Sequence, residues 1–139
     1  MIIRQGTYST SVNGGSYYRK MTLRGPESNP IKVYAWKNET VEIQGDAAAS
    51  QNIIDFDVEY FVMDNIGFSQ GSRGLRFFNS KNSLYLNLRI KNTGDVGLAM
   101  NDANAVYQNN TFRYNEISYT SGTAECFYLG EFSDLFVMC

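Results

Sequence analysis

Histidine is absent from this chain of 139 residues. Without it, Ser-His-Asp and Cys-His nucleophilic sites and histidine-ligated zinc sites are excluded. Cysteine is scarce: Cys126 and Cys139 are the only two, and we expect free thiols rather than a disulfide. Any catalysis would therefore depend on carboxylates, lysine, arginine, tyrosine or a metal ion bound by oxygen ligands.

Long apolar runs and a strong net charge are also missing. No stretch of about 20 apolar residues occurs and no signal-peptide pattern is recognised, so membrane insertion is not expected. The formal net charge of −2 argues against a strongly basic nucleic-acid-binding protein. Neither a phosphate-binding loop nor a dinucleotide-binding fingerprint is present.

An asparagine recurs every 22 residues in the middle of the chain, at Asn65, Asn87 and Asn109. Each has an apolar residue three positions before it and another three positions after it. A polar residue in phase with apolar neighbours is typical of a coiled repeat, in which equivalent residues of successive turns stack. We expect these three amides to form one buried structural ladder, bonded to each other and to the turn backbone.

Short runs with the pattern apolar–any–apolar accompany the asparagines. This is the period of two that a strand requires, and no helical period is sustained. One register of such runs is Ile31–Val33, Ile54–Phe56, Leu75–Phe77, Leu98–Met100 and Phe127–Leu129. Because turn residues separate the runs, with three short strands in each repeat, we predict an all-β fold. The predicted domain is a single parallel β-helix over residues 1–139, a solenoid of about six coils.

Several motifs extend this pattern over nearly the whole chain. They are Thr22-Leu23-Arg24-Gly25, Val41-Glu42-Ile43-Gln44-Gly45, the Asn65/Asn87/Asn109 column, Asn92-Thr93-Gly94-Asp95-Val96-Gly97-Leu98 and Thr123-Ala124-Glu125-Cys126-Phe127-Tyr128-Leu129-Gly130. In these motifs the chain resembles the right-handed parallel β-helix superfamily, the pectate-lyase-like proteins. The resemblance implies an asparagine ladder between the second and third strands of each coil. One departure is Cys126, where the family usually has glycine.

The resemblance also implies a short or truncated member of that superfamily. We expect part of a longer solenoid, because the chain opens inside a strand-and-turn unit and closes on apolar residues, with no cap at either end. The alternative is that bare ends are covered in a homo-oligomer. Since relatives are mostly secreted or periplasmic, an extracellular or periplasmic location is implied for the parent protein.

The residues between the apolar members of the register above are expected to point outward. They form the predicted column Lys32, Asp55, Arg76, Ala99 and Tyr128. One interpretation is an exposed charge ladder, worth roughly 0–1 kcal/mol per pair. The other is the floor of a sugar-binding groove, with Lys32, Arg76, Asp102 and Tyr128 as substrate-binding residues. A second predicted column, largely cationic, would either follow a polyanionic chain or keep the edge soluble: Arg4, Arg24, Gln44, Ser69, Lys91 and Arg113.

Two acidic residues, Asp95 and Glu125, fall in turns of adjacent predicted coils. An oxygen-rich site without histidine would suit Ca²⁺ better than zinc, so calcium is the expected cofactor; the alternative is that both acids face water. A lyase would further need a base and a cation, for which Lys91 and Arg76 are candidates. No catalytic set matches the family residue by residue.

Three functional hypotheses follow. The first is a carbohydrate-associated module related to polysaccharide lyases that binds acidic glycans (uronans), with calcium as a cofactor. The second is a structural or self-assembling β-helix segment without catalytic activity. The third is a uronan epimerase-like module. The fold hosts many unrelated activities, so whether the chain is an enzyme stays open.

Overall fold

The computed structural model describes residues 1–12, 15–16, 20–46, 52–122 and 125–130, and in these ranges it contains strands and turns but no helix. Sheet 1 is made of β1 (Ile2–Ile3), β6 (Ile31–Ala35), β9 (Phe61–Asp64), β12 (Leu84–Leu86) and β16 (Thr111–Arg113). Sheet 2 is made of β2 (Gly6–Ser9), β7 (Val41–Gln44), β10 (Gly67–Ser69), β13 (Arg89–Lys91) and β17 (Glu116–Ser118).

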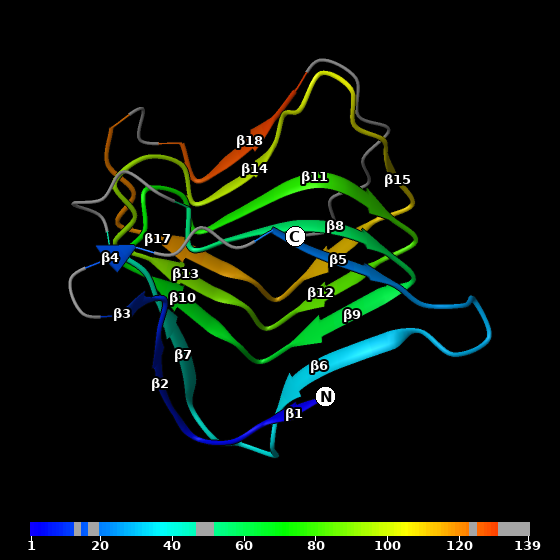
Figure 1. The fold of residues 1–139 in the computed structure, drawn as a ribbon, viewed down its shortest axis with the longest axis horizontal. Coiled ribbons are helices and arrows are strands. Elements are labelled where there is room, and N and C mark those ends of the chain that lie inside the picture. The colour runs from blue at the N-terminus through cyan, green and yellow to red at the C-terminus, as the bar shows by residue number, and fades with distance from the viewer. Residues whose placement is uncertain (13–14, 17–19, 47–51, 123–124, 131–139) are drawn as a thin grey trace.

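Sheet 3 contains β5 (Lys20–Arg24), β8 (Ile54–Glu59), β11 (Leu75–Lys81), β14 (Leu98–Met100) and β18 (Phe127–Leu129), and β15 (Tyr107–Gln108) pairs with β11. All pairings in these three sheets are parallel (Figure 1). A separate antiparallel pair is formed by β3 (Ser11–Val12) and β4 (Gly15–Ser16).

The chain passes repeatedly from sheet 3 to sheet 1, then to sheet 2 and back to sheet 3. From β6 to β18 each strand lies beside a strand of the same sheet from the preceding turn, so the turns stack. The all-β prediction is confirmed, and the stacked parallel sheets are consistent with a parallel β-solenoid. The described residues include no helix long and apolar enough to cross a membrane.

The turns between sheets share a left-handed backbone conformation at one residue. The sheet 3-to-1 turn has it at Tyr60, Asn82 and Asn109, the sheet 1-to-2 turn at Asn65, Asn87 and Tyr114, and the sheet 2-to-3 turn at Gln70, Asn92 and Tyr119. The φ angles of these nine residues lie between 49° and 60°. Asparagine tolerates this region better than most residues, which explains its recurrence in the sequence.

The single predicted ladder of three asparagines is wrong. Asn65 does stack on Asn87, but Asn109 lies at a different corner, where its amide donates a hydrogen bond of 3.1 Å to Asn82 Oδ1. The reason is unequal coil length: paired residues are 22 apart from Val62 to Leu84 but 27 apart from Leu84 to Thr111. A fixed spacing of 22 therefore passes from one corner to another. The amides are not buried either, since Asn65 is half-buried and Asn87 and Asn109 are exposed.

Aromatic rings of successive coils stack within a core that also contains many aliphatic side chains. The Phe77 ring lies 5.7 Å from that of Phe56 and 5.0 Å from that of Tyr85, and the Tyr85 ring lies 4.6 Å from that of Phe112. The sequence predicts outward or turn positions for Tyr34, Phe78, Tyr85, Tyr107 and Tyr128, but Tyr85 is fully buried. Its strand reads Leu-Tyr-Leu, so all three residues are candidates for the core and alternation alone does not choose between them. The buried hydroxyl bonds to Ser80 Oγ at 2.6 Å, and burial raises the pKa of Tyr85.

Candidate functional site

The register of the predicted column is correct for four of its five residues and wrong for the first, although Asp55 and Ala99 are buried. Asp55, Arg76, Ala99 and Tyr128 occupy equivalent positions of neighbouring sheet 3 strands. Lys32, however, lies in sheet 1 and pairs with Val62, and the position beside Asp55 is held by Lys20. The runs Met21–Leu23 and Ile31–Val33 have the same apolar alternation, so the sequence does not reveal which of them belongs to sheet 3.

A β-bulge in β11 places Phe78 on this outer face. The register with β8 shifts between Phe77 and Asn79, which leaves Phe78 as an extra residue. Bulges redirect side chains and often lie next to functional sites. The half-buried Phe78 ring has Lys20 Nζ 4.1 Å and Arg76 Cζ 4.5 Å from its centroid. Both distances are typical of cation–π contacts, so the ring holds two cations on the same surface.

Arg76 is further held by two carboxylates. Its Nη1 lies 4.0 Å from Asp55 Oδ2 and its Nη2 lies 3.6 Å from Asp102 Oδ2. Asp55 is fully buried, and its Oδ1 accepts a hydrogen bond of 2.8 Å from Asn52. Arg76 Nε is buried and has no hydrogen-bond partner among the residues that the structure describes. The two carboxylates thus position the guanidinium mainly by charge, and it keeps N–H donors that a ligand can use.

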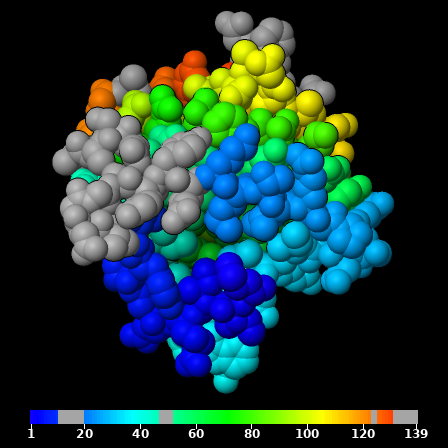
Figure 2. Space-filling view, in the orientation of Figure 1, coloured from blue at the N-terminus to red at the C-terminus, as the bar shows by residue number. Residues whose placement is uncertain are grey.

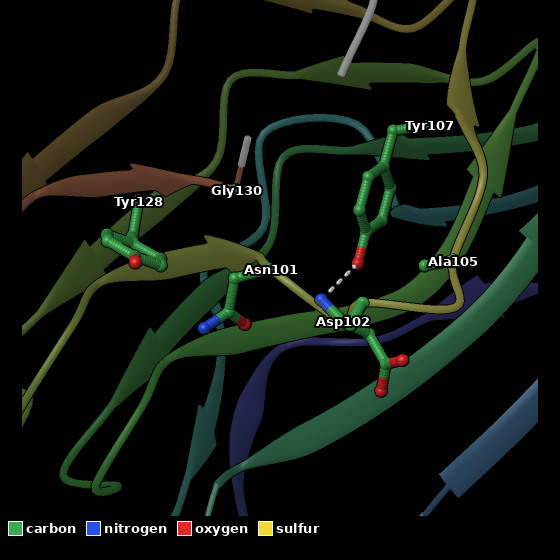
Figure 3. A pocket seen from close by; sticks show the side chains of 7 residues that line it. Asn101, Asp102, Ala105, Tyr107, Tyr128 and Gly130 are labelled. Atoms are coloured by element: carbon green, nitrogen blue, oxygen red, sulfur yellow. Dashed lines mark hydrogen bonds between the residues drawn. The ribbon is translucent and has the colours of Figure 1, made fainter. Parts of the chain in front are cut away.

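Beside Arg76 a hollow of about 210 Å³ opens on the same face (Figure 3). It is lined by Asn101, Asp102, Ala103, Ala105, Tyr107, Tyr128 and Gly130. The Tyr128 side chain is exposed at its rim, and Asn101 Oδ1 is buried without a hydrogen-bond partner in the described part of the chain. The hollow therefore combines an aromatic ring with an acceptor that a hydroxyl or amide of a ligand can satisfy.

Tyr107 closes one side of this hollow and is saturated by hydrogen bonds. Its hydroxyl donates to the carbonyl oxygen of Phe77 at 2.6 Å and accepts from the backbone N–H of Asp102 at 3.0 Å. Burial, with a smaller contribution from the Asp102 charge, raises the pKa of Tyr107 above its usual value. The neutral phenol thus acts as a fixed wall that holds the Asp102 loop against β11.

The predicted calcium ligands lie on adjacent coils, but they do not form a metal centre. The backbone N–H of Gly97 bonds to the carbonyl oxygen of Glu125, which places the Asp95 and Glu125 segments side by side. The Asp95 carboxylate forms an ion pair with Arg73 at 3.3 Å. Within the described ranges no group of three or more Asp, Glu, Cys or His residues is arranged to hold a metal ion. Calcium binding at Asp95 and Glu125 therefore stays a prediction.

The predicted cationic column is confirmed only in part: Gln44, Ser69 and Lys91 occupy equivalent positions of sheet 2, and its other three members lie elsewhere. Lys91 is exposed in sheet 2 between Ser69 and Ser118, whereas Arg76 lies in sheet 3, so the two candidate catalytic residues do not share a sheet. Arg24 lies in sheet 3, where it binds Asp57 at 2.7 Å, and Arg113 lies in sheet 1. Unequal coil lengths again explain why a sequence register does not become a spatial column.

Two residues of this site, Lys20 and Asn101, are not indicated by the sequence. Phe78 and Tyr107 are among the rings expected at outward or turn positions, where an aromatic face can bind a sugar; Phe78 lies half-buried on the outer face and Tyr107 is buried. The sequence also carries a signal for the bulge. The pair Phe77-Phe78 breaks the alternation of its strand, as a bulge does. Comparison of the chain with protein-family models finds no match, and comparisons with curated proteins and with solved structures find none either.

Proposed function

We propose that the outer face of sheet 3 binds an acidic glycan. The observation that carries the proposal is the arrangement of Lys20 and Arg76 around Phe78, next to a hollow with Tyr128 at its rim. Ammonium and guanidinium groups bind carboxylates by charge-assisted hydrogen bonds. Aromatic rings offer an apolar face for the C–H side of a sugar ring. A uronan presents both features in each residue.

The proposal extends the predicted kinship with pectate-lyase-like proteins. It includes a right-handed winding of the solenoid, about six coils as the sequence indicates, and an extracellular or periplasmic location of the parent protein. No catalytic step is included, because Arg76 is engaged by Asp55 and Asp102 and Lys91 lies in another sheet. Lyase and epimerase activity stay predictions. Ultraviolet absorbance of unsaturated uronides would detect a lyase, and inversion at C5 of the uronate would detect an epimerase.

Two lysines provide a matched test of this glycan site. Lys20→Gln is expected to weaken binding of trigalacturonate about fivefold or more, because it removes a cation from the Phe78 surface. Lys32→Gln, an exposed lysine in sheet 1, is expected to leave affinity unchanged. Isothermal titration at low ionic strength measures both, and repeating it with EDTA and with Asp95→Asn reads out any calcium dependence.

Two outcomes would reject the glycan proposal. One is that the wild-type chain binds neither trigalacturonate nor polygalacturonate, and the other is that the Lys20 and Lys32 variants weaken binding equally. A Phe78→Leu variant adds a second check, since it keeps an apolar side chain but removes the ring. We expect it to weaken binding while circular dichroism stays unchanged.

Self-association is a second candidate function, favoured by a different observation. At the N-terminal end of the stack (Figure 2), the side chains of Met1, Ile2 and Tyr8 are 67%, 46% and 44% exposed. With Ile3 and Ile43 they line an apolar hollow of about 510 Å³. Because β1 and β2 are the last strands of their sheets in the described structure, a second copy can add strands there.

The association is tested by placing charge on this end. We expect the apparent mass of the wild-type chain in light scattering to rise with concentration, and Ile2→Lys with Tyr8→Lys to give a monomer. Lys32→Gln serves as the control with no effect. A wild-type mass that stays monomeric at all concentrations would contradict this second candidate.

A further inference from the structure

A second polar hollow lies away from sheet 3, at the corner between sheets 1 and 2. This corner hollow has a volume of about 620 Å³. It is lined by charged and amide side chains from three successive turns of the chain, among them Lys37, Glu39, Asp64, Asn65, Asn87 and Arg89. From these residues we propose that the corner hollow binds a neutral sugar through a pair of vicinal hydroxyl groups.

The asparagines of this corner orient charged groups and do not bond to each other. Asn87 Nδ2 donates to Asp64 Oδ1 at 2.8 Å, and Asn65 Oδ1 accepts from Arg89 Nη1 at 2.8 Å. At the other asparagine corner the amides of Asn82 and Asn109 do bond to each other. The two corners have the same backbone conformation, so the turn itself does not require the charged partners. The difference between the corners lies in the side chains, and it produces a fixed row of polar groups at the surface.

The charges that line the corner hollow balance. Lys37 and Arg89 are positive, and Glu39 and Asp64 are negative. Glu39 is ionised because hydrogen bonds from Arg4, of 2.6 and 2.8 Å, lower the pKa of its carboxyl. With Arg4, which pairs with Glu39 next to the lining, the net charge is only +1, and a single exposed charge is screened by solvent. A neutral ligand with several hydroxyl groups suits this balance better than a uronate does.

The hydrogen-bonding groups match a vicinal diol. Asp64 Oδ1 accepts the hydrogen bond from Asn87. Its Oδ2 accepts no hydrogen bond within the described residues, so it can accept one from a ligand hydroxyl group. The guanidinium of Arg89 has five N–H donors. Its Nη1 donates to Asn65 Oδ1 and, at 3.5 Å, to the Asn87 carbonyl oxygen. A carboxylate acceptor and a guanidinium donor that line the same hollow can address neighbouring hydroxyls of one ring. The hydroxyl that donates to Asp64 can also accept from Arg89.

This corner site is independent of the glycan proposal for sheet 3. It shares no residue with the Lys20, Phe78 and Arg76 surface, and it is lined by the turn between sheets 1 and 2. Loss of binding at one site therefore says nothing about the other. An NMR titration distinguishes the two because it reports the residues that respond.

The test is a titration of isotope-labelled protein with galactose and mannose, two neutral sugars with cis vicinal hydroxyls, up to about 100 mM. We expect the side-chain signals of Asn65, Asn87 and Arg89 to shift with a Kd in the millimolar range, as single-sugar contacts usually give. Asp64→Asn is expected to weaken binding about tenfold, since it replaces the carboxylate acceptor while keeping its shape. Asn109→Gly, which removes an amide from the other corner and keeps its φ accessible, is the matched control and should leave the Kd unchanged.

Three results would overturn the corner site. The first is no shift of the three side-chain signals with either sugar at the highest concentration. The second is the same Kd for Asp64→Asn and the wild type in proteins with unchanged amide spectra. The third is a response of these signals to galacturonate alone, which would assign an anion site in place of a neutral-sugar site.

Discussion

Replacing Phe77 with alanine is expected to lower the free energy of unfolding by about 3–5 kcal/mol. Phe77 is fully buried in β11, and its ring lies between those of Phe56 and Tyr85 in the aromatic stack. The substitution removes the contacts of that ring and leaves a cavity. Because each coil contacts only its neighbours, a void in the central coil weakens the link between both halves of the solenoid. Urea unfolding followed by circular dichroism measures the change.

The adjacent residue provides the control. Phe78 follows Phe77 in the same strand but lies half-buried on the outer face. We expect Phe78→Ala to cost about 1 kcal/mol or less, as a change at a partly solvated position. Equal losses for the two variants would contradict the inward position of Phe77 and the outward position of Phe78.

Replacing Gly97 with alanine is expected to destabilise the fold by about 3 kcal/mol. A Cβ at this position would lie 2.3 Å from Ile117 Cγ2 and 2.7 Å from the carbonyl oxygen of Cys126. The second of these atoms belongs to the backbone of the next coil, so it cannot move aside without separating β14 from β18. Overpacking of this kind cannot be relieved by a change of rotamer alone. The expected result is a fall in thermal midpoint together with weaker amide protection in β14 and β18.

Gly130→Ala is the milder comparison for the same experiment. An added Cβ there has its nearest neighbour, the Asn101 Cα, at 3.1 Å, so a shift of a few tenths of an ångström accommodates it. We expect a loss of about 1 kcal/mol or less. If Gly97→Ala were no more destabilising than Gly130→Ala, the close approach of adjacent coils at Gly97 would be wrong.

Three residues of the candidate site are predictable from the sequence. Arg76, Asp102 and Tyr128 were predicted as substrate-binding residues, and the structure brings Arg76 to 3.6 Å from Asp102 and places Asp102 and Tyr128 in one hollow. Their binding role itself is a proposal. These three are near the apolar runs of the later coils, where alternation defines the strand clearly. Lys32 was misplaced because two runs of equal pattern precede β8.

The contacts of this site that the sequence does not indicate have a common physical reason. Lys20 reaches the site through pairing of β5 with β8, a contact between strands more than 30 residues apart that local pattern does not encode. Phe78 depends on a bulge, and Tyr107 depends on the insertion that lengthens one coil to 27 residues. A repeat with a fixed period predicts stacking only while the coils keep that period.

What the sequence by itself determined is the class of structure. Alternating apolar residues separated by Gly and Asn turns allow strands and exclude sustained helices, because side-chain direction in a strand depends only on position along the chain. Tertiary structure alone decided which strands stack, which asparagines share a corner and which charges meet. Those outcomes depend on loop lengths and on close packing between coils, where one added or missing residue moves every later side chain to a new partner.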